Sequence, residues 1–127
     1  MNTLNVLLVE DDPNMRLGCE QAFELAGIPA ASVSSAEAAQ REIERNPPAV
    51  IVTDMRLGGA DGLHLLRWSQ ARDANLPVIM VTGHGDVTLA VEAMRSGAYD
   101  FITKPFASDH LVEVVRRALE KRSLTLE

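Results

Sequence analysis

The sequence predicts an α/β protein built on a doubly wound, five-stranded parallel sheet. Two observations predict this class. Short apolar segments alternate with longer segments of helical periodicity along the 127 residues, and the strongest apolar segments show no polar alternation. A strand that is apolar at every position is covered on both faces, and right-handed crossovers between such strands place helices on both sides of a parallel sheet.

The composition indicates one domain with one core. The chain is 46% hydrophobic and 24% charged, and its formal net charge of -6 argues against nucleic-acid binding by this domain. Its single cysteine, Cys19, cannot form an internal disulfide and is expected to be a small core residue. No signal peptide or bilayer-spanning apolar run is evident, so we expect a cytoplasmic protein that does not contact a membrane.

The first half of the chain predicts three strands and the helices between them. The first strand covers residues 5–9, and Asp12 can N-cap a helix that begins at Pro13 and stops at Gly27. Residues 30–33 form a weakly patterned strand, which favours an edge position. Ser34 and Glu37 match a capping box that opens a helix ending at residue 45. The central strand, residues 50–54, follows and ends in a carboxylate.

The second half continues the alternation. Asp61 can cap a helix over residues 62–72, and a strand over residues 78–81 leads to a loop that Asp86 closes by capping the next helix. The fifth strand covers residues 99–103, and Ser108 can cap the last helix. The fourth helix has Val87, Ala90, Val91 and Met94 on one face, and the last helix has Leu111, Val114, Val115, Ala118 and Leu119 facing inward. Four late cations, Arg116, Arg117, Lys121 and Arg122, are expected to be solvated or in a subunit contact.

Acidic side chains follow two strands that this fold brings together. Glu10, Asp11 and Asp12 end the first strand, and Asp54 ends the central one. The carboxyl ends of parallel strands share one edge of the sheet, where open α/β sheets place their ligand sites. Two carboxylates at ~4 Å repel by about 4 kcal/mol at an effective dielectric constant of ~20. Such a cluster needs a cation.

The residues at the strand ends closely resemble those of the receiver domain of two-component response regulators, and the resemblance covers the whole chain. It rests on Asp11-Asp12, Asp54, Thr82 and Lys104, in this order and each at a strand end. Residues 81–86 and 97–106 look most like receivers of the NtrC and DctD type, which precede a sigma-54-activating ATPase domain and a DNA-binding helix-turn-helix. The resemblance implies the flavodoxin-like strand order 2-1-3-4-5. It also implies a receiver over residues 1–122, with residues 123–127 starting a linker to an output domain.

The resemblance further implies the role of each site residue. Asp54 would accept a phosphoryl group from a partner sensor histidine kinase, and Lys104 would pair with Asp54 before transfer and with the phosphoryl group afterwards. The expected Mg²⁺ ligands are Asp12, Asp54 and the backbone carbonyl of Arg56, with Asp11 acting through water. The chemistry agrees, because a carboxylate can be a nucleophile and Mg²⁺ suits a site with few carboxylates and several waters.

The resemblance also implies how phosphorylation is read out. The Thr82 hydroxyl would donate to a phosphoryl oxygen, Phe101 would turn inward with it, and the Lys104–Pro105 peptide would be cis. We expect a homodimer through the fourth helix, fifth strand and last helix, or through a seam formed by Val112, Leu119 and Leu126. Whether phosphorylation makes or breaks that dimer stays open, as do the cognate kinase, its stimulus and the target genes.

One departure from the family concerns the loop after Asp54. The family commonly has proline four residues after the phosphorylated aspartate, and this chain has Gly58 followed by Gly59. The stiffness of the loop and the lifetime of the acyl phosphate are therefore open. Arg56 and His84 are expected to project toward the site, where either could tune attack by water.

Three other functions compete with the signalling switch. A phosphohydrolase of the haloacid dehalogenase type would need a second aspartate where Arg56 stands, and a flavodoxin-like cofactor binder would need a phosphate loop where Glu10-Asp11-Asp12 stands. A receiver that switches without phosphate is disfavoured by the complete residue set. We therefore expect a phosphoacceptor that at most catalyses its own phosphorylation and dephosphorylation, not an enzyme with a separate substrate.

Overall fold

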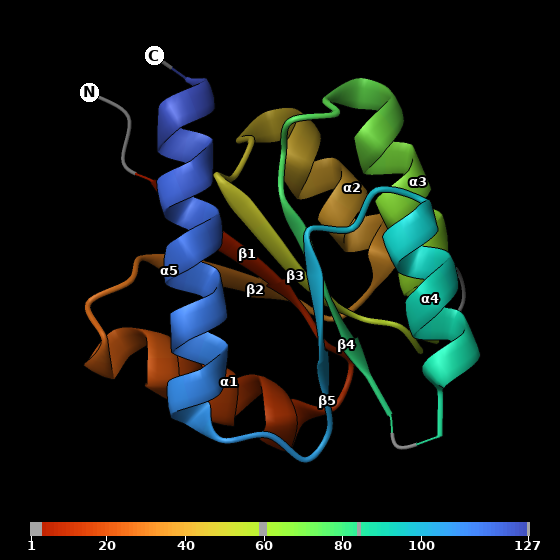
Figure 1. Cartoon of the computed structure of the whole chain (residues 1–127). Helices are drawn as coiled ribbons and strands as arrows, with labels where there is room; N and C mark the ends of the chain where they lie inside the picture. Colours follow the sequence, from red (N-terminus) through yellow and green to blue (C-terminus); the bar gives the residue numbers. More distant parts are fainter. Residues whose placement is uncertain (1–3, 59–60, 84, 127) are drawn as a thin grey trace.

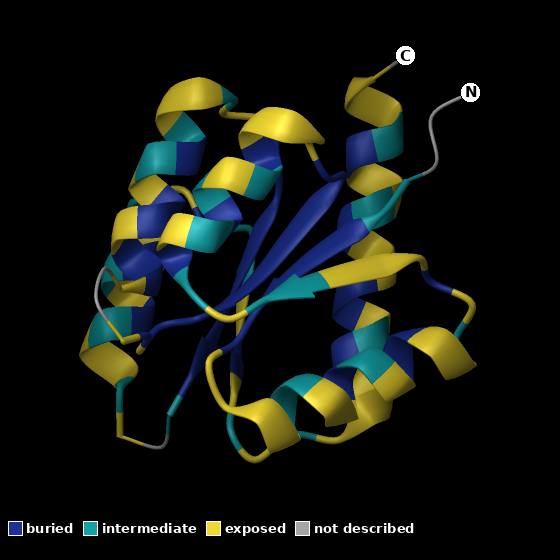
Figure 2. Ribbon diagram, turned by 180° about the vertical axis from the view of Figure 1, so that it is seen from behind, coloured by how far each residue is buried: buried dark blue, intermediate teal, exposed yellow. Residues whose placement is uncertain are grey.

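The computed structural model describes residues 4–58, 61–83 and 85–126 and contains the predicted sheet. Five parallel strands pair in the order β2-β1-β3-β4-β5, which confirms the doubly wound, flavodoxin-like topology. The strands are β1 Val6–Val9, β2 Ala30–Val33, β3 Val50–Asp54, β4 Val78–Thr82 and β5 Asp100–Thr103. All residues of β1, β3 and β4 are buried, whereas β2 is partly exposed at the edge of the sheet, as its weak pattern predicted (Figure 2).

Helices cover both faces of the sheet (Figure 1). They are α1 Pro13–Leu25, α2 Ala36–Arg45, α3 Gly62–Arg72, α4 Val87–Arg95 and α5 Ser108–Thr125. The core on one face joins the sheet to α1 and α5, and the core on the other face joins it to α2, α3 and α4. Because each crossover runs from the carboxyl end of one strand to the amino end of the next, the loops after β1, β3, β4 and β5 all gather at one edge.

The helix starts confirm two predicted caps and correct three others. Asp12 and Asp61 accept hydrogen bonds from backbone amides at the starts of α1 and α3. The cap of α2 is Ser35 and not Ser34, since Ser35 Oγ accepts from the Ala38 amide at 3.1 Å. Asp86 stands at the N-cap position of α4 without capping it, because its carboxylate pairs with an arginine. Ser108 is the first residue of α5 and not its cap, which is Ala107 without a side-chain hydrogen bond.

The predicted apolar face of α4 is largely exposed. Val87 is 71%, Val91 45% and Met94 40% exposed, whereas Ala90 and Ala93 are buried. Helix α4 thus rests on the sheet through two alanines and the partly buried Leu89. The side chains of Val87, Val91 and Met94 are exposed to solvent.

The end of α5 departs from the prediction for its cations. Arg122 is buried at 9% exposure, so the expectation of a solvated or subunit-contacting side chain is wrong for this residue. Val115, next to the proposed seam, is fully buried in the domain core, and Leu126 is 54% exposed. The helix continues to Thr125, across the expected domain boundary at residue 122, and that boundary stays a prediction.

Two local predictions are confirmed. Cys19 is buried, and burial together with the charge of Glu10 raises the pKa of its thiol to about 11, which keeps it unreactive. The Lys104–Pro105 peptide bond is cis. Within the described part of the chain, no helix is long and apolar enough to cross a bilayer.

Candidate functional site

Asp54 is the last residue of β3, at the centre of the sheet's carboxyl edge. The residue is 7% exposed and belongs to a fully buried strand. One carboxylate oxygen, Oδ2, accepts from Lys104 Nζ at 2.6 Å, and the other, Oδ1, accepts from the Arg56 amide at 3.2 Å. The loop after β5 and the loop after β3 therefore fix the orientation of this carboxylate from two sides.

Lys104 is the cation of the site. Its ammonium group also lies 3.5 Å from Glu10 Oε1. Partial burial on its own would lower the pKa of Lys104, but the hydrogen bond to Asp54 and the negative charges of Asp54 and Glu10 raise it above its usual value. The lysine therefore stays charged at neutral pH and can accompany negative charge that arrives on Asp54.

Glu10 is the site residue that our assignment of ligands missed. Register pairs Val9 with Thr53, so the next residue of each chain segment, Glu10 and Asp54, stand side by side. Glu10 is 3% exposed and accepts from the Asp12 amide at 3.1 Å. Burial is the main reason why the pKa of Glu10 rises to about 7, and the charge of Asp54 adds to the rise. The three consecutive acids were visible in the sequence, but only the register tells which of them face Asp54.

The carboxylate cluster consists of Glu10, Asp11 and Asp54. Oxygens of these three side chains lie within 4.8 Å of one another. Asp12, the expected direct Mg²⁺ ligand, is not among them. It is exposed and its Oδ1 accepts from the Asn14 amide at 2.9 Å, which occupies it as the cap of α1.

Arg56 follows Asp54 and reaches across to the loop before α4. Its guanidinium forms two hydrogen bonds with the Asp86 carboxylate, at 2.8 and 3.1 Å. The pair raises the pKa of Arg56 and lowers that of Asp86. The side chain expected to project toward the phosphoacceptor is therefore held by Asp86, and His84, which shared that expectation, lies outside the described residues.

Thr82 and Phe101 occupy different environments. Thr82 ends β4, is 2% exposed, and donates a long hydrogen bond of 3.5 Å to the Ile102 carbonyl. Phe101 on β5 is 40% exposed. Both line a groove of about 260 Å³ between β5 and α4, together with Val87 and Val91. Phe101 is thus exposed in this structure, and its inward turn on phosphorylation stays a prediction.

The donor set fits a hard divalent cation. Three carboxylates face one another, and a single lysine provides the opposing charge among the contacts described. All the donors are oxygens, which Mg²⁺ prefers over nitrogen or sulfur. Burial is the main cause of the raised pKa of Glu10, and the neighbouring charge of Asp54 adds to it.

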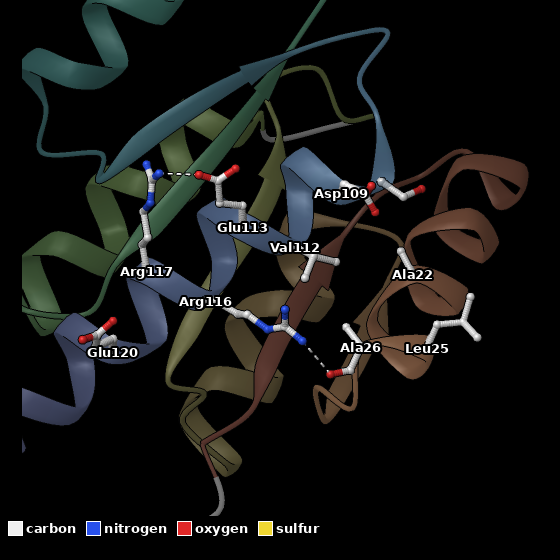
Figure 3. A pocket seen from close by; sticks show the side chains of 10 residues that line it. Ala22, Leu25, Ala26, Asp109, Val112, Glu113, Arg116, Arg117 and Glu120 are labelled. Carbon is white, nitrogen blue, oxygen red and sulfur yellow. Dashed lines mark hydrogen bonds and ion pairs between the residues drawn. The ribbon is translucent and has the colours of Figure 1, made fainter.

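A second hollow lies between α1 and α5 and is separate from this site (Figure 3). It measures about 530 Å³ and includes Leu25 and Val112, with none of the predicted site residues in its lining. Arg116 donates to the Ala26 carbonyl at 3.0 Å across it, and Arg117 pairs with Glu113 on the same helix. These two cations are exposed, as expected.

A parallel sheet in this order, with an aspartate ending the central strand, carboxylates beside it and a lysine paired with it, places the chain in the class of doubly wound α/β domains with an acidic site at the carboxyl edge of the sheet. Within that class the chain belongs to the response regulator receiver domain family, which residues 6–116 match.

Relatives of known sequence and structure agree with this family. The C4-dicarboxylate transport transcriptional regulatory protein DctD of Pseudomonas aeruginosa is 52% identical over 122 residues, 96% of this chain and 26% of that protein. The DNA-binding transcriptional regulator NtrC of Escherichia coli is 36% identical over 114 residues, 90% of this chain and 24% of that protein. The receiver domain of NtrX from Brucella abortus superimposes with a TM-score of 0.88 at 37% identity, covering 91% of this chain and 98% of that one. The chain spans about a quarter of the length of these two regulators.

Proposed function

We propose that the domain is a phosphorylation-dependent switch in which Asp54 accepts a phosphoryl group from a sensor histidine kinase. The observation that supports this most directly is the Asp54 carboxylate, oriented by Lys104 at 2.6 Å inside a cluster of acids. An Asp54 oxygen attacks phosphorus, the bond from phosphorus to the donor's imidazole nitrogen breaks, and the imidazole takes up a proton as it leaves. The product is an acyl phosphate.

Lys104 supports the transfer by positioning and by charge. It holds Asp54 before the reaction and follows the negative charge to the phosphoryl oxygens afterwards. Bound Mg²⁺ would supply neutralisation of the charge on those oxygens. We propose Asp11, Asp54 and the Arg56 backbone carbonyl as its direct ligands. Glu10 would act through water, in the role that the sequence predicted for Asp11. This replaces the expected assignment to Asp12, which caps α1.

The readout we propose runs through Thr82 and Phe101. The Thr82 hydroxyl has only a long bond to the Ile102 carbonyl, so a phosphoryl oxygen would offer it a stronger acceptor. Its movement would empty space in the groove beside β5 and let Phe101 leave its exposed position. Thr82→Ala should then accept phosphate without a change in the Phe101 ring resonances, whereas wild type should show that change.

We further propose that the domain dimerises through α4, β5 and α5 and controls transcription through an output domain of the sigma-54-dependent type, acting in the cytoplasm. The exposed Val87, Val91 and Met94 on α4 support such a surface. The names of the two relatives as transcriptional regulators support the output.

Intact mass spectrometry tests the phosphoacceptor. Wild type, Asp54→Asn and Asp109→Asn are each incubated with acetyl phosphate and Mg²⁺, with and without chelator. Wild type and Asp109→Asn, which changes an exposed acid on α5, should gain one phosphoryl group only without chelator. Gain by Asp54→Asn, or no gain by wild type where a known receiver is modified, would contradict the proposal.

A further inference from the structure

The last turns of α5 contain a buried arginine, Arg122. After Ala118, Arg122 is the one buried side chain among the residues described in this helix and its end. Leu119 and Ser123 are half-buried, and Glu120, Lys121, Leu124 and Thr125 are exposed. Apolar burial therefore dominates up to Ala118. Beyond it, α5 contacts the domain through the half-buried Leu119, through the Lys121 ammonium 5.4 Å from the centre of the Tyr99 ring, and through the buried Arg122.

Arg122 makes one strong contact. Its Nη2 lies 2.6 Å from Asp73 Oδ2, in the turn between α3 and β4. Partial burial opposes ionisation of Asp73, but the hydrogen bonds from Arg122 and the Asn75 amide lower its pKa below the usual value, so it stays ionised at neutral pH. This contact lies at the amino edge of the sheet, opposite the Asp54 edge.

Asp73 is itself rigidly placed. Its amide donates to the Ser69 carbonyl at 2.9 Å, its carbonyl accepts from the Leu76 amide at 3.1 Å, and its Oδ1 accepts from the Asn75 amide at 3.0 Å. The anchor for Arg122 is thus part of the fold and not a mobile surface carboxylate.

The rest of the guanidinium faces a small cavity. The cavity measures about 130 Å³ and is lined by Ile43, Pro47, Ser69, Arg72, Asp73, Leu76 and Arg122. Arg122 Nε and Ser69 Oγ have no hydrogen-bond partner within the described parts of the chain. Burying a guanidinium with a single partner costs desolvation free energy, so Arg122 contributes little to the overall stability of the domain. Its contact instead fixes the position of one helix.

We propose that Arg122 and Asp73 form a clasp that fixes the last turns of α5, and with them the direction in which this helix leaves the domain. The clasp is a conformational device independent of the phosphoacceptor. Opening it frees residues 119–126 while residues 108–118 stay docked through their apolar side chains. Because Asp73 is partly exposed, the clasp is weakened by salt.

Hydrogen exchange of backbone amides tests the clasp. Asp73→Asn removes the charge but keeps an oxygen for the Asn75 amide, and it should raise exchange over residues 119–126 about tenfold while residues 111–118 are unchanged. In the double variant Arg122→Met/Asp73→Asn, these amides should exchange no faster than in Asp73→Asn alone. The second substitution removes the Arg122 charge that Asp73→Asn leaves without a partner. Arg117→Met, which breaks an exposed pair on the same helix, is the matched control and should change nothing beyond its own turn.

Unchanged exchange over residues 119–126 in Asp73→Asn would overturn the proposal. So would an equal increase along all of α5, since that would indicate general destabilisation. If Asp73→Asn does not fold, the test uses the salt dependence of exchange in the wild-type domain. Raising NaCl from 0.05 to 1 M should then accelerate exchange over residues 119–126 relative to 111–118, and no difference between the two segments would overturn the clasp.

Discussion

Glu10 shows how much one residue of register matters at the site. Consecutive acids after a strand indicate a cation site, and the acidic cluster that they predicted around Asp54 is present in the structure. The sequence did not tell which acids enter the cluster, because β1 ends at Val9 and the three acids lie in the turn between β1 and α1, where Asp12 is taken up as the cap of the helix. Glu10 faces Asp54 and Asp12 caps a helix, and both roles are natural for a carboxylate.

The first residue-scale prediction concerns pH. The pKa of Glu10 is about 7 in the folded domain against an ordinary 4.5. Between pH 4.5 and 7, Glu10 is therefore protonated in the folded domain and ionised in the unfolded chain. Without metal, the free energy of unfolding should therefore fall as pH rises from 5.5 to 8, by about 2 kcal/mol. Urea unfolding in chelator measures it.

Glu10→Gln is the control for this pH dependence. The variant cannot ionise at this position, so its stability should be nearly flat across the same interval. A wild-type curve parallel to that of Glu10→Gln would show that Glu10 titrates normally.

The second residue-scale prediction separates the acids as Mg²⁺ ligands. Asp12→Asn keeps a good helix cap and should bind Mg²⁺ with wild-type affinity. Glu10→Gln should weaken binding about tenfold, and Asp11→Asn by more, since one is expected to act through water and the other directly. The rise in melting temperature with Mg²⁺ reports these affinities. Loss of the response in Asp12→Asn alone would restore the assignment made from the sequence.

At the scale of elements, Gly62 joins the site to its scaffold. Its amide donates to the Met55 carbonyl at 2.9 Å, and a Cβ added there would lie 2.1 Å from the Asp54 carbonyl oxygen. Gly62→Ala should therefore push α3 away from the end of β3 and destabilise the domain by about 2–3 kcal/mol. Denaturant unfolding measures the change.

Gly18→Ala is the comparison for Gly62→Ala. Gly18 is exposed in the middle of α1, and nothing lies within 4 Å of its added Cβ. Alanine there should stabilise the domain by roughly 0.5–1 kcal/mol through helix propensity. If both substitutions had the same sign, the close approach at Gly62 would not be the cause.

The elements themselves were largely predictable, and the exceptions have physical reasons. Ser34 and Ser35 are chemically equal caps, and the backbone geometry chooses Ser35. The apolar face of α4 is typical of a buried helix, but this helix lies at the β5 side of the sheet and buries only Ala90 and Ala93 fully, with Leu89 partly buried. Arg122 looked like a solvated cation because a sequence does not show that Asp73, 49 residues away, meets it.

At the scale of the molecule, the alternation of strands and helices predicted the fold. It did not predict which helix faces are exposed on the surface. Periodicity tells which residues of a helix share a face, and it cannot tell whether a neighbour or solvent meets that face. This is why the topology and both cores were predictable while the dimer surface stays a proposal. Exposed Val91 and Leu25, on opposite layers of the fold, make that proposal testable.

Sedimentation of the phosphorylated domain distinguishes the possible dimer surfaces. If α4, β5 and α5 form the contact, Val91→Asp should keep the domain monomeric after treatment with acetyl phosphate and Mg²⁺, because a charge would be buried without a partner. Leu25→Asp, at the hollow between α1 and α5, and Leu126→Asp, in the C-terminal seam, should then dimerise like wild type. Loss of the dimer in Leu126→Asp alone would place the contact on the seam, and loss in Leu25→Asp alone would place it at the hollow between α1 and α5. A wild-type domain that stays monomeric at high concentration, with and without phosphate, would exclude both surfaces expected from the sequence.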